Sequence, residues 1–265
     1  MGKDTSRLKR SVAITGATSG IGEALAIECA KRGETLFLSG RSQDRLESIV
    51  HRCKELGAAH VEGTILDVRH AGSVAKWLEQ SDATSPLNRI FANAGVATGE
   101  ESSANVRTTF ETNIGGVVNT VLPAIEIFRR HKAQDPAFHA QILMTSSIAG
   151  YGPLPSCPSY SATKAAVKTW ALSLRGMLAK EGIEVSAICP GFVRSRITDR
   201  NTCPMPFFLE ADKAARIILS RADADVGLIA FPWPMRFASW AFSILPERVN
   251  GFFARLLPPK TSKDR

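Results

Sequence analysis

The feature that most constrains this chain is a regular alternation of short apolar or β-branched runs with longer amphipathic runs. The short runs are typical of strands buried on both faces, and the longer runs repeat apolar residues at helical spacing. The predicted strands cover residues 12–15, 35–39, 60–66, 89–92, 140–145, 184–189 and 226–231. The predicted helices cover residues 20–32, 42–55, 71–79, 106–130, 160–179 and 210–220. Alternation of this kind predicts an α/β protein.

The order of the elements also predicts how the chain is wound. Parallel strands joined by right-handed helical crossovers leave helices on both faces of one sheet. The expected fold is therefore a doubly wound, Rossmann-like parallel sheet. With 265 residues the chain is long enough for two domains, but its unbroken alternation favours a single domain over residues 1–265.

A glycine-rich turn follows the first predicted strand. Glycines at this point allow a tight turn and a close approach of the backbone to a pyrophosphate, and the next helix directs its positive end at the phosphates. Many turns contain glycine, but here the flanking strand and helix are both predicted. The expected cofactor-binding residues of this turn are Gly16, Thr18, Ser19, Gly20, Ile21 and Gly22.

Two further motifs follow in the chain. The run Asn93, Ala94 and Gly95 comes after the fourth predicted strand, and a Tyr-Ser-Ala-Thr-Lys run extends from Tyr160 to Lys164. Together with a Thr-Gly-x-x-x-Gly-x-Gly turn, these motifs resemble those of the short-chain dehydrogenases/reductases, in the same order. The resemblance covers roughly residues 10–195 and implies an oxidoreductase with a nicotinamide cofactor.

The end of the second predicted strand indicates which cofactor binds. An acidic residue there binds the ribose hydroxyls of NAD, whereas an arginine accommodates the extra phosphate of NADP. This sequence has Gly40 where NAD-preferring family members place aspartate, and Arg41 follows it. Alternatively, Arg41 is an ordinary surface residue at the start of a helix, but the helix dipole does not stabilise a cation at that end. We therefore expect NADP(H).

The resemblance implies the remaining cofactor contacts. Asp67 and Val68 would hold the adenine, and Asn93 would brace the sheet beside the cofactor, in the same segment as Ala94 and Gly95. A segment after the sixth strand would lie against the nicotinamide. Its residues are Pro190, Gly191, Val193 and Ser195, with Ser195 where the family commonly has threonine.

Tyr160 and Lys164 are the expected centre of the chemistry. They are four residues apart in a predicted helix, so their side chains share one face. A phenol with a pKa of about 10 is a poor base at neutral pH, and a nearby ammonium favours the phenolate. Such a pair is usually an exposed helix face, so its significance comes from the accompanying motifs.

Two more residues complete the site implied by the resemblance. Ser147, at the end of the predicted strand 140–145 and thirteen residues before Tyr160, has the spacing of the catalytic serine. Ser146 lacks that spacing and is interpreted as a turn-capping hydroxyl. Asn113 matches the helical asparagine that positions a water against the lysine.

The implied reaction is hydride transfer between nicotinamide C4 and a carbonyl or alcohol carbon. Ser147 would bind the substrate oxygen and Tyr160 would give or take its proton. Lys164 would keep Tyr160 reactive and bind the nicotinamide ribose, and Asn113 with a water would link the site to solvent. Donors aimed at the developing alkoxide would supply most of the stabilisation.

The substrate is expected to be lipophilic: a ketone, an acyl compound or a steroid-like molecule. The substrate-side loop lies within residues 196–209, at the start of an extension over residues 196–265. Apolar residues expected beside the substrate are Pro153, Leu154, Met205, Phe207 and Phe208; ordinary packing of the loop is the alternative. Because cellular NADPH is mostly reduced, we expect carbonyl reduction.

Two other functions are weighed against this one. A non-catalytic NADP(H)-binding regulator on the same fold would be expected to lack the serine or the Tyr/Lys pair, and this chain has all three. A nucleotide-sugar epimerase of the longer family branch would have a tighter glycine turn and a larger C-terminal domain.

Charge and composition restrict the partners. The formal net charge is +8, but the basic residues are dispersed and accompany no nucleic-acid-binding module, so nucleic acid is disfavoured. Five scattered cysteines argue against a disulfide framework, and the histidines show no metal-ligand spacing. Without a secretory apolar segment near the start, we expect a cytoplasmic protein.

The C-terminal sequence predicts two strongly apolar helices. The first covers residues 234–245, and the second begins at Pro246. They would cover the substrate pocket, join subunits of a homodimer or homotetramer, or lie on a membrane surface. Family members of this length commonly assemble partly through this region, which places oligomer contact first. Trp233 and Trp240 place peripheral membrane contact second. On the second helix the apolar face is Val249, Phe252, Phe253 and Leu256, and the cations for headgroups are Arg248, Arg255 and Lys260.

Overall fold

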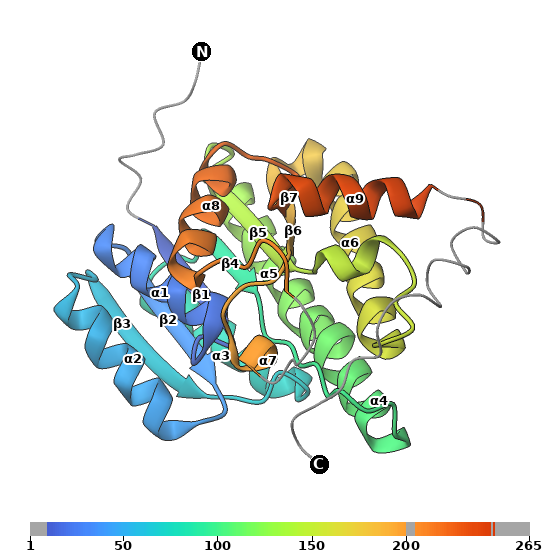
Figure 1. Ribbon diagram of the computed structural model, residues 1–265. Coiled ribbons are helices and arrows are strands. Elements are labelled where there is room, and N and C mark those ends of the chain that lie inside the picture. The colour runs from blue at the N-terminus through green and yellow to red at the C-terminus, as the bar shows by residue number, and fades with distance from the viewer. Residues whose placement is uncertain (1–9, 200–204, 245, 247–265) are drawn as a thin grey trace.

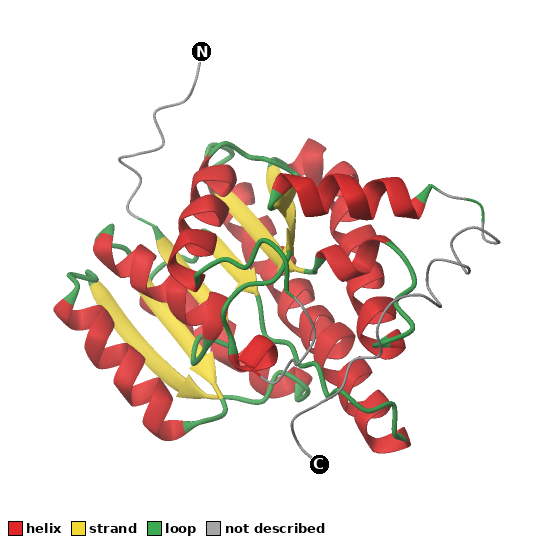
Figure 2. Ribbon diagram, viewed as in Figure 1, coloured by secondary structure: helices red, strands yellow, loops and turns green. Residues whose placement is uncertain are grey.

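The computed structural model describes residues 10–199, 205–244 and 246 (Figure 1). Within them, one parallel sheet of seven strands has the order β3-β2-β1-β4-β5-β6-β7. Its strands are the yellow arrows in Figure 2. The order changes direction between β1 and β4, which confirms the predicted doubly wound fold. The strands are β1 (Ser11–Thr15), β2 (Thr35–Gly40), β3 (His60–Ile65), β4 (Arg89–Ala92), β5 (Ala140–Thr145), β6 (Ile183–Pro190) and β7 (Leu228–Phe231).

Helices cover both faces of the sheet. One apolar core joins the sheet to α3 (Ala71–Thr84), α5 (Gly116–Gln134) and α6 (Pro158–Leu178). A second core joins the other face to α1 (Gly20–Lys31), α2 (Gln43–Glu55) and α8 (Ala211–Asp223). The shorter helices are α4 (Ser103–Phe110), α7 (Arg196–Asp199) and α9 (Trp233–Ser243).

The predicted helix over residues 106–130 is wrong as a single element. The chain forms α4, then a π-helical turn, η2 (Glu111–Gly115), and then α5. Inside η2, the side chain of Asn113 bonds both backbone polar groups of Val96. These bonds fix Asn113 against the loop after β4, and the π turn accommodates that position. Local bulges of this kind are frequent at functional sites.

The first predicted C-terminal helix is α9. Its bounds, Trp233–Ser243, differ by one or two residues from those expected. The second predicted helix begins at Pro246, and its remaining residues lie outside the described part of the chain. Across the described ranges, no helix combines the length and apolar character needed to span a bilayer.

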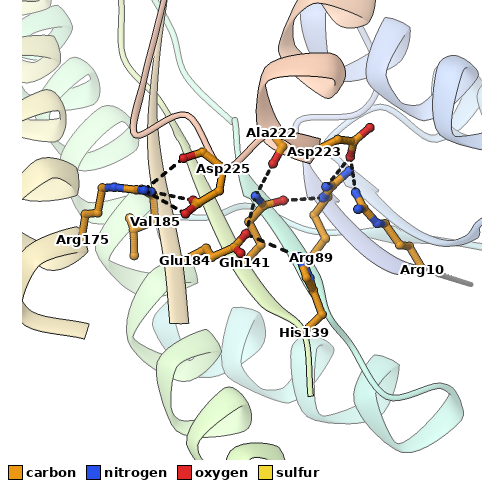
Figure 3. A network of polar contacts seen from close by, with 10 residues as sticks. All are labelled: Arg10, Arg89, His139, Gln141, Arg175, Glu184, Val185, Ala222, Asp223 and Asp225. Atoms are coloured by element: carbon orange, nitrogen blue, oxygen red, sulfur yellow. Dashed lines mark hydrogen bonds and ion pairs between the residues drawn. The ribbon is translucent and has the colours of Figure 1, made fainter. Parts of the chain in front are cut away.

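A buried polar network ties α8 to the amino ends of the strands (Figure 3). The Arg89 side chain is fully buried; its Nη2 lies 2.8 Å from Asp223 Oδ1, and its Nε donates to Gln141 Oε1 at 2.7 Å. Arg10 also pairs with Asp223, and Gln141 Nε2 donates to the carbonyl of Ala222 at 2.7 Å. The network lies at the edge of the sheet opposite the glycine-rich turn.

Asp223→Asn should destabilise the fold by about 2–4 kcal/mol, because it leaves two buried guanidinium groups without their carboxylate. The control is Asp212→Asn in the same helix, where the carboxylate pairs with the exposed Arg216. The control should leave the free energy of unfolding nearly unchanged. Urea unfolding of both variants measures the difference; equal losses would contradict a special role for Asp223.

Candidate active site

A cleft of about 470 Å³ lies at the carboxyl ends of the strands. It is bordered by the glycine-rich turn, by the segments after β2 to β6, and by α6. This is where ligands bind in open α/β sheets. Most predicted site residues line it: Gly16, Thr18, Ser19, Gly20, Ile21, Arg41, Asp67, Val68, Asn93, Ala94, Gly95, Ser147, Tyr160, Lys164, Pro190, Gly191, Val193 and Ser195.

Two predicted residues, Gly22 and Asn113, do not line the cleft but lie behind it. A Cβ on Gly22 would stand 2.3 Å from the carbonyl oxygen of Gly16, so a glycine is required there for the turn to pack on its helix. Gly16 itself has φ +68°, a conformation that favours glycine. The turn therefore brings its backbone and the N-terminus of α1 to the cleft, a cradle that fits a pyrophosphate.

Asn93 braces the sheet. Its Nδ2 donates to the carbonyl of Thr15 at 3.1 Å, and its Oδ1 accepts from Thr145 Oγ1 at 3.2 Å. Thr15 Oγ1 in turn accepts from the backbone N–H groups of Asn93 and Ala94. The ends of β1, β4 and β5 are thereby joined. Sequence reasoning missed Thr15 and Thr145, although each is the last residue of a strand that leads into the site.

The far end of the cleft is cationic. Arg41 and Arg45 both line it, close to Asp67. Asp67 forms a hydrogen-bonded ion pair with Arg69 at 2.7 Å, which lowers the pKa of that carboxyl; the charge of Arg41 adds to the effect. Asp67 is thus ionised at neutral pH and available as an acceptor. Arg45 was missed, and its spacing of one helical turn from Arg41 was the available signal.

Tyr160 and Ser147 are hydrogen-bonded to each other in the cleft. Burial raises the pKa of Tyr160 to about 12, and the bond with Ser147 opposes this rise. Tyr160 therefore carries its proton at neutral pH. A phenol in this state can donate a proton to an oxygen held beside it.

Lys164 is buried next to this pair. Its Nζ donates to the carbonyl of Thr145 at 2.9 Å and lies 5.7 Å from the centre of the Tyr160 ring. Burial lowers the pKa of Lys164 to about 8. The expected lowering of the Tyr160 pKa by a nearby ammonium is not seen: burial raises that pKa, and the ammonium is directed at the Thr145 carbonyl.

Asn113 is fully buried behind the cleft. Its Oδ1 accepts from Val96 N at 2.8 Å, and its Nδ2 donates to Val96 O at 2.9 Å and Thr163 Oγ1 at 3.1 Å. Thr163 Oγ1 donates to the carbonyl of Tyr160 at 2.8 Å. Asn113 thus connects the loop after β4 to α6 through Thr163, a contact that sequence reasoning missed. Its water-mediated link to Lys164 stays a prediction.

The turn-capping role expected of Ser146 is wrong, and the catalytic role of Ser147 stays a prediction. Ser147, not Ser146, caps a turn: its Oγ accepts from Ala149 N at 3.1 Å at the start of η3 (Ile148–Tyr151). Ser146 Oγ instead donates to the carbonyl of Lys164 at 2.6 Å. Ser147 still reaches Tyr160 because a hydroxyl can accept and donate at once.

None of the five apolar residues expected beside the substrate lines the main cleft. Pro153 and Leu154 line a second, mainly apolar hollow beside α6, also of about 470 Å³. Phe207 is exposed and has φ +56°, and the Arg194 guanidinium lies 5.4 Å from the centre of the Phe208 ring. Residues 200–204 of this loop lie outside the described ranges. Arg196, the first residue of the expected substrate-side loop, lines the main cleft.

No metal site is found among the described residues: no three His, Cys, Asp or Glu side chains there are grouped to hold an ion. The hydrogen-bond donors that line the main cleft include hydroxyl, ammonium, guanidinium and backbone N–H groups.

Comparison with known proteins finds a matching family and similar chains. The sequence profile described as short chain dehydrogenase matches residues 10–204. An "uncharacterized oxidoreductase" of Myxococcus xanthus is 32% identical over 258 residues, which cover 94% of this chain and 97% of that protein. The "11-beta-hydroxysteroid dehydrogenase A" of Sesamum indicum is 31% identical over 91% of this chain and 74% of its own length.

A solved structure has the same fold. The short-chain dehydrogenase from Sphingobium yanoikuyae, in complex with NADPH, superposes with a TM-score of 0.77 at 22% identity. The match covers 97% of this chain and all of that one.

Proposed function

The chain belongs to the short-chain dehydrogenase family, and on that premise we propose that it is an NADP(H)-dependent reductase of lipophilic carbonyl compounds. It is an oxidoreductase by family; the cofactor, the substrate class and the direction are the proposal. The observation that carries it is the bonded pair of Tyr160 and Ser147, next to a buried Lys164, in a cleft with a cationic far end.

Each residue of the cleft has a separate role in the proposed carbonyl reduction. NADPH, when bound, supplies the hydride. Ser147 and Tyr160 hold the carbonyl oxygen, and Tyr160 gives it a proton as charge develops there. Lys164 carries a positive charge below a pH of about 8 and would bind the nicotinamide ribose. Tyr160, which is protonated at neutral pH, can supply the proton that reduction needs.

Two features support NADP(H) over NAD(H). A Cβ on Gly40 would stand 2.4 Å from Thr18 Cγ2, so the aspartate that binds ribose hydroxyls in NAD-preferring relatives does not fit here. Arg41 and Arg45 border the same end of the cleft and provide two guanidinium groups for a phosphate.

NADPH should therefore bind more tightly than NADH by about 1–3 kcal/mol, the size of a charge-assisted phosphate contact. Arg41→Ala should remove most of that difference and leave NADH binding nearly unchanged. Arg52→Ala is the matched control, because Arg52 lies on α2 away from the cleft. Fluorescence titration of the three proteins with both cofactors measures the six affinities. Equal affinities in the unmutated protein would contradict the assignment.

The lipophilic substrate class rests on the apolar hollow beside α6 and on the name of the Sesamum relative. A panel of ketones, from short water-soluble to steroid-like compounds, tests it through the loss of NADPH absorbance. The rates should rise with apolar size. Turnover confined to small charged aldehydes would contradict this class.

A non-catalytic NADP(H)-binding regulator is the alternative. The same panel separates the two, because a regulator would bind NADPH and reduce none of the ketones. The homodimer or homotetramer stays a prediction that light scattering can test.

A further inference from the structure

Helix α9 lies at the outside of the molecule (Figure 1), and its outer face carries a stripe of exposed apolar side chains. Trp233, Phe237, Trp240 and Ile244, just beyond the helix end, are spaced by four, three and four residues, which places them on one face. Their exposed fractions are 73%, 58%, 49% and 63%. Single exposed apolar residues are ordinary, but a contiguous patch of this kind marks an interaction site.

The opposite face of α9 borders both sides of the active-site region. A Cβ on Gly191, which lines the main cleft, would stand 2.9 Å from Met235 Sδ. A Cβ on Gly152, which lines the apolar hollow, would stand 3.2 Å from Phe242 Cδ1. A surface that binds the outer face of α9 therefore comes to rest next to the site.

The charges around the stripe favour an anionic partner. Residues 226–246 contain no aspartate or glutamate, and Arg236 lies on α9 itself. The Lys168 ammonium stands 4.0 Å from the centre of the Tyr151 ring, and the charge of Arg236 also acts on Tyr151. The sequence after α9, residues 247–265, has five basic and two acidic residues.

The kinds of side chain favour a lipid surface over a second copy of this chain. Tryptophan is enriched where apolar and aqueous layers meet, because its ring is apolar and its N–H is polar. A stable protein interface needs about 800 Å² from each partner, more than one short helix face provides.

We propose that α9 docks this protein on an anionic lipid bilayer, with Trp233, Phe237 and Trp240 in the interfacial layer, so that the adjacent site takes lipophilic carbonyl substrates from the membrane. The docking stands on the exposed stripe and its charges. The source of the substrate rests on the proposed function.

The test is sedimentation of the full-length protein with phosphatidylcholine vesicles that contain or lack phosphatidylglycerol. The unmutated protein should pellet with the anionic vesicles, with a blue shift of tryptophan emission. Trp240→Glu should weaken that binding by roughly tenfold or more, because it replaces an apolar anchor with a charge of the wrong sign. Met177→Glu is the control, because Met177 is an equally exposed apolar residue on α6.

Other outcomes would overturn the docking. These are no binding to either vesicle, equal binding to neutral vesicles, or equal losses in the two variants. A second copy as the true occupant would appear as a drop in mass by light scattering for Trp240→Glu without vesicles, together with no pelleting of the unmutated protein.

A kinetic experiment distinguishes a failure of the proposed docking from a failure of the proposed function. Trp240→Glu should retain turnover of a short water-soluble ketone and lose roughly tenfold on a long-chain ketone presented in anionic vesicles. Equal retention on both ketones would contradict delivery from the membrane. If the unmutated protein reduces neither ketone, the proposed function fails, while sedimentation still decides the docking.

Discussion

Tyr160→Phe should lower ketone turnover by roughly a hundredfold or more, because the change removes the transferable proton and almost no volume. The fold and NADPH affinity should be retained, since the ring still fills its place in the cleft. Steady-state NADPH oxidation measures the first effect, and fluorescence titration with NADPH measures the second.

The control for this experiment is the chain's other tyrosine. Tyr151 lines the apolar hollow and not the main cleft, so Tyr151→Phe should keep near-normal turnover of a small ketone. Near-normal turnover in Tyr160→Phe would show that another group donates the proton.

Lys164→Met should damage both turnover and cofactor binding. The change keeps the length of the side chain but removes the ammonium that is held against the carbonyl of Thr145 at 2.9 Å. We expect a loss of roughly a hundredfold in turnover and of roughly tenfold in NADPH affinity, the size of one charge-assisted hydrogen bond. Lys168→Met is the control one helical turn later, outside the main cleft.

The pH dependence follows from the same side chain. Burial lowers the pKa of Lys164 to about 8, so its charge is present below that pH and lost above it. The kcat/KM for NADPH reports groups of the free enzyme and should fall as pH rises through about 8. Lys164→Met should lose this fall and Lys168→Met should keep it. A wild-type profile that is flat to pH 10 would contradict the assignment.

The sequence predicted the sheet well because most of its strands, β1, β2, β4, β5 and β6, are buried along nearly their whole length. Such strands read as continuous apolar runs, as in Ile142-Leu143-Met144, and the glycine turn marks where the first run ends. The strand and helix ends moved by a few residues. The last strand starts at Leu228, two residues late, because Asp225 has a positive φ that ends the preceding turn.

The π-helical turn at Asn113 could not be predicted. Its cause is a set of bonds from Asn113 to Val96, seventeen residues away, and to Thr163 in another helix. The local periodicity of a sequence gives no information about contacts between residues that are far apart in the chain. Sequence reasoning placed Asn113 near the site through the resemblance alone.

The protonation of Tyr160 could not be predicted either. Spacing placed Tyr160 and Lys164 on one face, but it did not give the depth of burial or the direction of the ammonium. Burial raises the pKa of Tyr160 and lowers that of Lys164, so each side chain favours its neutral form more than in water. Whether burial or the charge of the neighbouring side chain has the larger effect on each pKa depends on the packing around α6.

The sequence also could not predict which face of α9 would be exposed. The sequence predicted a helix that is apolar nearly all round but left open which side would be covered. The fold decides this, because Met235 and Phe242 turn toward Gly191 and Gly152 and the two tryptophans of the stripe remain outside.

The most direct measurement follows the hydride itself. NADPH that carries deuterium at the transferable C4 position is incubated with the fastest ketone of the panel, and the product is analysed by mass spectrometry. We expect a secondary alcohol with one deuterium on the former carbonyl carbon, formed by the unmutated protein and nearly absent with Tyr160→Phe. Binding of NADPH without any deuterated alcohol from the panel would contradict a carbonyl reductase and favour a non-catalytic NADPH-binding protein.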